Sequence, residues 1–88
     1  MKIVFLRQPK KFIQKADKNL KDKIKEEILK IATDPLAGKR LKGKKFKSIF
    51  SYHFMFVRVN YRIAYKVIGD LLIISITSRE NFYRDLRV

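Results

Sequence analysis

The chain has 88 residues and is expected to form a single domain, residues 1–88, with one modest core. It carries 22 lysines and arginines against 8 aspartates and glutamates, a formal net charge of +14, while apolar residues make up 47%. This combination excludes a disordered basic tail and indicates a folded domain with a polyanionic partner. Nucleic acid is the first candidate for that partner, and an acidic protein is the second.

The absence of cysteine excludes disulfides and zinc–thiolate sites. The apolar run at the N-terminus is too short, and too soon followed by charge, for a signal peptide. The longest apolar run, Leu71 to Ile76, is far below the roughly 20 residues that a membrane-spanning helix needs. We therefore expect a soluble, cytoplasmic protein that has no membrane partner.

The first element predicted is a strand over Lys2 to Arg7, where apolar side chains occupy both alternating faces. That pattern favours a strand inside a sheet, covered at least in part on both faces. Pro9 suits the first turn of a helix, where its missing N–H has no intrahelical role. A short helix is then predicted over Lys10 to Ala16. Its inward side chains are expected to be Phe12, Ile13 and Ala16.

A second helix is predicted to begin after Asn19, which is expected to be its N-cap, and to end at Thr33. Its apolar residues recur at helical spacing on one face, namely Leu20, Ile24, Ile28 and Ile31. The helix ends there because Asp34 precedes Pro35, and a residue before proline is pushed out of the helical region. Residues Lys10 to Thr33 are thus predicted to form an antiparallel helical hairpin that lies on the sheet.

The next segment, Leu36 to Lys47, is predicted to be a loop that binds phosphate. It has six basic residues in nine positions: Lys39, Arg40, Lys42, Lys44, Lys45 and Lys47. Such a density on a flexible segment favours contact with nucleic acid, and these residues are our candidates for RNA binding. A solvated, charged connector is the alternative interpretation.

Three consecutive strands and a short helix are predicted for the rest of the chain. The strands are Ile49 to Arg58, Tyr61 to Ile68 and Leu71 to Thr77, with turns at Asn60 and Gly69-Asp70 and a terminal helical segment from Glu80 to Leu86. Alternation predicts a core face and an open face. The core face is expected to hold Phe54, Phe56, Ile63, Tyr65, Leu72, Ile74 and Ile76. The open face is expected to hold His53, Met55, Arg62 and Arg79. A β-bulge near Asn60 would reverse part of this assignment.

The element order β-α-α-β-β-β, followed by a short terminal helix, predicts an α+β fold. Its sheet is mostly antiparallel and carries the helical hairpin on one face. This order, the basic loop and the strings LKG (Leu41 to Gly43), YRIAYKV (Tyr61 to Val67) and SRENFY (Ser78 to Tyr83) resemble the RelE/ParE superfamily of toxins of type II toxin–antitoxin systems. The similarity is greater to the RelE-like members, covers nearly the whole chain and implies the small RelE-like fold.

The resemblance implies an endoribonuclease that cleaves mRNA in association with the ribosome. In that family the ribose 2′-OH attacks the adjacent phosphate, and no metal or cofactor is required. The implied partners are a cognate acidic antitoxin, mRNA and the ribosome, and operator DNA through the antitoxin complex. Two alternatives stay open: a ParE-like toxin that poisons DNA gyrase, and a catalytically degenerate toxin that binds only its antitoxin and DNA.

By position, the resemblance implies that Arg62 and Arg79 bind the scissile phosphate. It also implies that Tyr83 stacks on a base or assists proton transfer. Arg58 lies near a turn, and the alternation of apolar residues does not determine the strand register there. We add Arg58 to the candidates for RNA binding.

Three positions depart from the family pattern. His53 and Met55 stand where well-studied members have lysines, and Ser78 stands where many relatives have histidine. Because imidazole is the side chain most often used for proton transfer, His53 becomes the fourth candidate catalytic residue.

Overall fold

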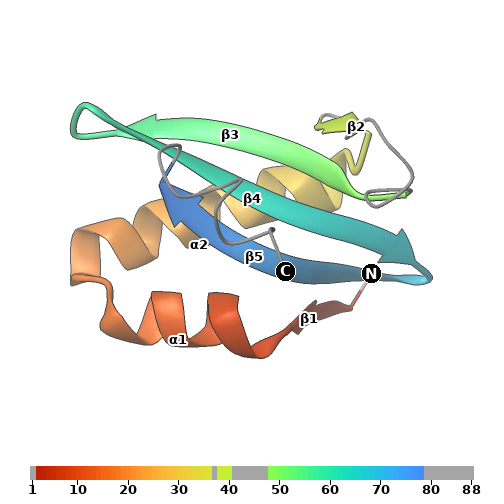
Figure 1. The fold of residues 1–88 in the computed structure, drawn as a ribbon, viewed down its shortest axis with the longest axis horizontal. Coiled ribbons are helices and arrows are strands. Elements are labelled where there is room, and N and C mark those ends of the chain that lie inside the picture. Colours follow the sequence, from red (N-terminus) through yellow and green to blue (C-terminus); the bar gives the residue numbers. More distant parts are fainter. Residues whose placement is uncertain (1, 37, 41–47, 79–88) are drawn as a thin grey trace.

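The structure is a computed structural model that describes residues 2–36, 38–40 and 48–78. Its elements, in chain order, are β1 (Ile3–Phe5), α1 (Arg7–Lys15), α2 (Lys18–Thr33), β2 (Lys39–Arg40), β3 (Phe50–Phe56), β4 (Val59–Ile68) and β5 (Asp70–Ser78). The strands form one sheet in the order β1-β5-β4-β3-β2, and both helices pack on one of its faces (Figure 1). The α+β fold with a helical hairpin on a mostly antiparallel sheet is confirmed. The predicted terminal helical segment, 80–86, lies outside the described residues.

β1 lies at one edge of the sheet, so the expectation of a strand inside the sheet was wrong. It pairs only with β5, in parallel, with Ile3 opposite Leu71 and Phe5 opposite Ile73. The physical reason is that β4 already pairs with one side of β5, so β1 adds to the free edge of β5 and has no further neighbour. The side-chain amide of Gln8 extends this pairing: Nε2 donates to the Ile76 carbonyl and Oε1 accepts from the Ile76 amide, both at 2.8 Å.

The helical hairpin follows the predicted pattern with two changes at its helix starts. α1 begins at Arg7, and the buried Pro9 lies in its first turn. The N-cap of α2 is Asp17 rather than Asn19. The Asp17 backbone is extended, and its carboxylate accepts a 2.8 Å hydrogen bond from the Leu20 amide. The helix therefore begins at Lys18, two residues earlier than predicted, because Asp17 already satisfies an unpaired N–H of the first turn.

The apolar stripe of α2 forms the helical half of the core, as predicted. Ile24, Ile28 and Ile31 are buried, and the half-buried Leu20 packs against them. Phe12 and Ile13 of α1 also pack against this core. α2 ends at Thr33, as the following Asp34-Pro35 predicts.

The β3–β4 hairpin turns at Val57-Arg58, and the predicted turn at Asn60 was wrong. Both turn residues have positive φ, 49° for Val57 and 63° for Arg58. Phe56 pairs with Val59, so the loop has two residues, and positive φ at both is typical of a type I′ turn. Asn60 instead belongs to β4, opposite Met55. The tight reversal was invisible in the sequence because neither residue has the usual preference for this conformation.

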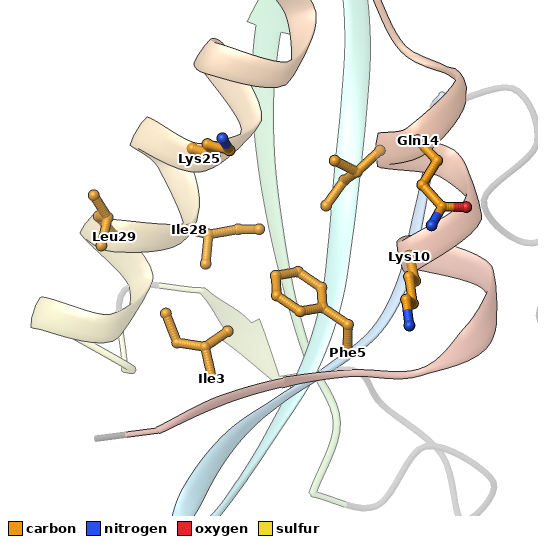
Figure 2. A pocket seen from close by; sticks show the side chains of 8 residues that line it. Ile3, Phe5, Lys10, Gln14, Lys25, Ile28 and Leu29 are labelled. Atoms are coloured by element: carbon orange, nitrogen blue, oxygen red, sulfur yellow. The ribbon is translucent and has the colours of Figure 1, made fainter.

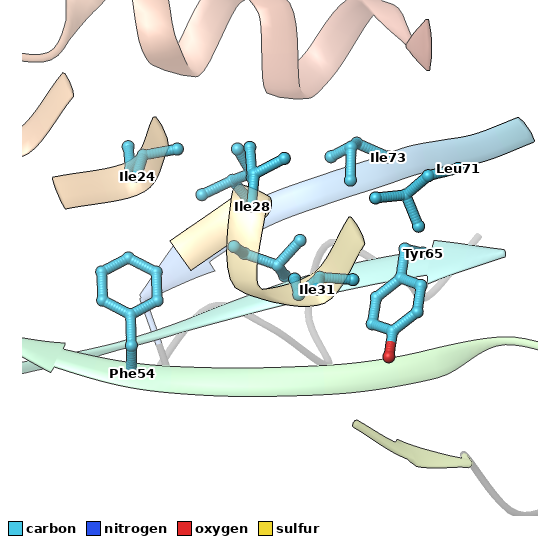
Figure 3. Close-up of a cluster of buried hydrophobic side chains, with 9 residues drawn as sticks. Ile24, Ile28, Ile31, Phe54, Tyr65, Leu71 and Ile73 are labelled. Atoms are coloured by element: carbon cyan, nitrogen blue, oxygen red, sulfur yellow. The ribbon is translucent and has the colours of Figure 1, made fainter. Parts of the chain in front are cut away.

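A β-bulge in β5 changes which of its residues reach the core. Ala64 pairs with Ser75 and Tyr65 with Ile73, which leaves Ile74 as an extra residue. Leu71, Ile73 and Ile76 are fully buried, as shown in part in Figure 3. The prediction that Leu72 and Ile74 share the core face with Ile76 was therefore wrong.

The β3 and β4 contributions to the core agree with the alternation. Phe54, Ile63 and Tyr65 are buried, and the half-buried Phe56 packs against them. The ring of Tyr61 stacks on Phe54 with centroids 5.3 Å apart. The face of the sheet away from the helices is then the one that holds His53, Met55 and Arg62. We call it the open face.

Candidate functional site

The centre of the open face is a pair of side chains on neighbouring strands. His53 lies directly opposite Arg62 in the β3–β4 register, and Arg62 lies opposite Thr77 in the β4–β5 register. The two-residue turn makes Phe56–Val59 a hydrogen-bonded pair, and alternation then makes His53–Arg62 a non-hydrogen-bonded one. The Cα atoms of such a pair are about 4.5 Å apart, and their side chains lie close together. An imidazole and a guanidinium are therefore neighbours on this face.

Access differs between the two members of this pair. His53 is exposed, and Arg62 is half-buried. The planar guanidinium of an arginine suits bidentate binding of a phosphate. The exposed imidazole beside it is positioned to accept or donate a proton. The arrangement can thus bind an anion and move a proton at one place.

The other predicted catalytic residues, Arg79 and Tyr83, lie outside the described residues. The prediction that Arg79 shares this face with Arg62, and that Tyr83 stacks on a base or assists proton transfer, stays a prediction. Met55 lies on the open face as expected and is 61% exposed. It is opposite Asn60, next along the hairpin from His53 and Arg62.

The predicted RNA-binding residues fall at both ends of β3. Arg58 is exposed at the β3–β4 turn. At the other end, Lys39 and Arg40 are not loop residues, since they form β2 and pair with Ser51 and Phe50. This backbone pairs with the edge of β3 that β4 leaves free. The local composition does not indicate such a pairing. Lys42, Lys44, Lys45 and Lys47 lie outside the described residues.

The start of the basic segment is anchored to the core through Tyr65. The Tyr65 hydroxyl donates to the Pro35 carbonyl and accepts a 3.1 Å hydrogen bond from the Gly38 amide. A Cβ added at Gly38 would lie 2.6 Å from the Tyr65 oxygen and 3.0 Å from the Ser51 carbonyl. Only glycine allows the backbone to approach this closely. The position of β2 beside β3 is thus set by a buried side chain.

Two buried hydroxyls on the open face were assigned no role by the sequence. Ser75 is 6% exposed and Thr77 is 3% exposed, and neither hydroxyl has a hydrogen-bond partner in the part of the chain that the structure describes. The register of β4 and β5 brings Thr77 beside Arg62.

On the helix side, a buried carboxylate links α2 to β3. Glu27 accepts hydrogen bonds from the Tyr52 hydroxyl at 2.7 Å and from Lys30 at 2.9 Å, with Lys23 at 3.4 Å. Burial raises the pKa of Glu27, but these hydrogen bonds and the lysine charges outweigh it, and the net shift is downward. Burial and the bond to Glu27 raise the pKa of Tyr52 to about 12, so its hydroxyl remains a donor at neutral pH. This network is structural, because it faces away from His53 and Arg62.

A second surface feature is an apolar groove between β1, α1 and α2, with a volume of about 450 Å³ (Figure 2). Ile3, Phe5, Ile13, Ile28 and Leu29 provide its apolar walls, and Lys10, Gln14 and Lys25 also line it. Leu29 is 61% exposed and Phe5 is 37% exposed. Exposed apolar side chains around a groove are typical of a binding surface for another protein.

The described residues contain no group of three histidine or carboxylate side chains placed to hold a metal ion. None of the described helices is long and apolar enough to cross a membrane.

Comparison with known proteins agrees with the fold. The sequence model of the ParE-like toxins of type II bacterial toxin–antitoxin systems matches residues 3–87. The crystal structure of the isolated E. coli RelE toxin is similar, with a TM-score of 0.69 at 20% identity over 96% of this chain and 92% of that one. A chain of the intact E. coli RelBE toxin–antitoxin complex gives 0.68 at 20% identity over 85% and 92%. No curated protein matches significantly. At this identity the structural likeness shows the fold alone.

Proposed function

This chain belongs to the family of ParE-like toxins of type II bacterial toxin–antitoxin systems, and from that premise we propose that it is a ribosome-associated mRNA endonuclease of the cytoplasm. The observation that carries the proposal is the register that sets His53 opposite Arg62 on the open face. Cleavage of RNA by its own 2′-OH requires a cation at the phosphate and a group that moves protons. This pair provides both. The structural likeness to the E. coli RelE toxin supports the same proposal.

In the proposed reaction, Arg62 donates two N–H groups to the non-bridging oxygens of the scissile phosphate. His53 accepts the proton of the ribose 2′-OH as the 2′-oxygen forms a bond to phosphorus. The bond from phosphorus to the 5′-oxygen breaks, and that oxygen takes up a proton. The products are a 2′,3′-cyclic phosphate and a free 5′-OH. The proposal uses no metal.

Arg79 and Tyr83 complete the proposed site as sequence-based predictions. Arg79 would place a second cation at the phosphate. Tyr83 would protonate the departing 5′-oxygen or stack on a neighbouring base. The basic residues from Lys39 to Lys47, together with Arg58, would dock RNA or ribosomal phosphates, since a chain of net charge +14 attracts a polyanion.

We further propose that an acidic cognate antitoxin binds in the apolar groove between β1, α1 and α2. The groove offers an apolar floor with Lys10 and Lys25 among its lining residues, which suits an amphipathic segment that carries carboxylates. The RelBE complex is a toxin with its antitoxin, which supports such a partner. Operator DNA would then be bound through the complex.

The test is primer extension on mRNA incubated with translating ribosomes and the purified protein. The wild type should cut the message in the ribosomal A site. Arg62→Ala and His53→Ala should each lower the cleavage rate by about 100-fold or more. Arg7→Ala is the matched control, because Arg7 is an exposed arginine at the start of α1. This variant should cleave mRNA like the wild type. Intact mRNA with the wild type would contradict the proposal.

A second candidate is poisoning of DNA gyrase, which the ParE-like family description favours. The same scaffold can carry either function, so the fold does not choose between them. Inhibition of gyrase supercoiling by the purified protein, with mRNA left uncut, would establish this alternative. A chain that does neither, yet still binds its antitoxin, would be a degenerate toxin.

A further inference from the structure

The last part of β5 extends beyond the strand that pairs with its outer edge. β1 pairs only with Leu71, Leu72 and Ile73, and the Leu6 amide adds a last hydrogen bond to the Ile73 carbonyl. Ile74 is the extra residue of the bulge, and β5 then continues to Ser78. Buried backbone N–H and C=O groups in proteins are almost always paired, because an unpaired group has lost water without a replacement. The outer edge of this last part therefore takes its partner from another element.

Gln8 is this partner. It lies in the first turn of α1, which packs against β5 (Figure 1). Its Nε2 donates to the Ile76 carbonyl and its Oε1 accepts from the Ile76 amide, both at 2.8 Å. A side-chain amide has the donor and the acceptor of a peptide group, so Gln8 takes the place of a strand residue at this edge. Two short bonds to one distant residue thus fix a long side chain that water would otherwise solvate.

The strand register shows how Ile76 relates to the candidate site. Because His53 and Arg62 form a non-hydrogen-bonded pair, the backbone groups of Arg62 point towards β5 and bond to those of Thr77. The backbone groups of Ile76 must then point away from β4, and there they meet Gln8. Two successive residues of β5 are therefore held from opposite sides, Thr77 by β4 and Ile76 by α1.

The hold from α1 is important because the bulge interrupts the β4–β5 pairing just before this point. A bulge leaves one residue unpaired and increases the local twist of the strand. After Ile74, Gln8 provides the two outer-side hydrogen bonds of β5 that involve described residues. Without them, the last residues of β5 would be free to twist away from β4. The backbone of Arg62 would then lose a fixed neighbour at Thr77.

We propose that Gln8 is a positioning residue for the open face. By holding Ile76 from α1, its amide keeps Thr77 paired with Arg62 and restricts the β4 backbone that presents Arg62 opposite His53. Gln8 itself lies on α1 and touches none of these three residues through a hydrogen bond. That this row of residues cleaves RNA rests on the proposed function, whereas the hold on β5 does not.

Gln8→Met tests the hold, because methionine has a similar length and has neither the donor nor the acceptor of the amide. Hydrogen exchange of the Ile76 amide should become at least about tenfold faster through local opening. The Leu71 amide should keep its rate, since it lies where β1 covers β5. The NMR shifts of the Thr77 and Arg62 amides should change, as expected for residues that the hold positions.

Kinetics test the positioning role, and they are measured well below the thermal midpoint of the variant. Gln8→Met should lower kcat for mRNA cleavage by about tenfold and leave KM within about twofold, because the residues that dock RNA are untouched. Gln14→Met is the control for the NMR measurements. It makes the same change at an exposed position of α1 that has no hydrogen bond to the described part of the sheet, and it should leave the Ile76 exchange rate unchanged.

A purely structural role for Gln8 predicts a different result. The thermal midpoint would fall and Ile76 would exchange faster, but the Thr77 and Arg62 shifts and kcat would stay as in the wild type. That result would overturn this inference. A wild type that leaves mRNA intact would overturn the nuclease proposal, and the NMR shifts would then decide this inference alone. Altered shifts at Thr77, Arg62 and His53 in Gln8→Met would support it, and unchanged shifts would overturn it.

Discussion

The hydroxyl of Tyr52 donates a 2.7 Å hydrogen bond to Oε1 of Glu27, which joins the middle of β3 to the middle of α2. Tyr52 precedes His53, and successive strand residues face opposite sides of the sheet. The same β3 backbone therefore holds Tyr52 on the helices and presents His53 to the open face. The hydrogen bond on one side thus contributes to the position of the imidazole on the other.

Glu27→Gln should destabilise the protein by about 1–3 kcal/mol at neutral pH, because it removes charge-assisted hydrogen bonds of a buried side chain. The pKa of Glu27 is lowered in the folded state. Its contribution to the free energy of unfolding is therefore fully present above the ordinary pKa of 4.5, and it is lost as the pH falls through the pKa of the folded state. Urea unfolding at several pH values should show a higher free energy of unfolding for the wild type than for Glu27→Gln at pH 7. This advantage should shrink in acid. An advantage that stays constant down to pH 3 would contradict this assignment.

Val57→Asn should stabilise the β3–β4 hairpin by about 1 kcal/mol. Val57 has φ of 49°, a left-handed conformation that is unfavourable for a β-branched residue and well tolerated by asparagine. The measurement is the free energy of unfolding from urea titration. Val59→Asn is the control, since Val59 lies in β4 and asparagine is disfavoured in strands. A gain in the control equal to that at Val57 would show that the turn conformation is not the cause.

Gly38→Ala should destabilise the protein by about 1–3 kcal/mol, because the new Cβ would lie 2.6 Å from the buried Tyr65 hydroxyl. Gly69→Asn provides the comparison. Gly69 has φ of +77°, which asparagine tolerates, and no atom lies within 4 Å of its added Cβ. Thermal unfolding of both variants measures the difference. Equal midpoints for the two would show that Gly38 does not require the close approach.

Leu29→Asp should weaken antitoxin binding by about tenfold or more without affecting the fold, since Leu29 is 61% exposed and lines the apolar groove. Leu36→Asp introduces the same change at a residue that is 75% exposed and does not line the groove. Isothermal titration with the cognate antitoxin compares them. The affinity of the wild type should also fall as salt rises, because the partner is expected to be acidic. Equal affinities for the two variants would place the antitoxin elsewhere.

Local patterns in the sequence were sufficient for the elements and for most of the core. The period of Ile24, Ile28 and Ile31 determined the inward face of α2, and alternation along β3 and β4 placed His53, Met55 and Arg62 together on the open face. These patterns work because side-chain direction in a regular helix or strand depends only on position along the chain. The net charge and the C-terminal strings likewise indicated the family that the whole-chain comparison established.

The tertiary structure decided what depends on contacts between distant segments. The bulge at Ile74 moved Leu72 and Ile74 off the predicted core face, and only the strand order showed that β1 is an edge and that Lys39 and Arg40 pair with β3. The same register brought Thr77 beside Arg62. Alternation alone specifies a face but not which residue stands opposite which, because register is set by turns and bulges. The sequence by itself therefore placed His53 and Arg62 on one face, and the folded sheet set them opposite each other and added the buried hydroxyls beside them.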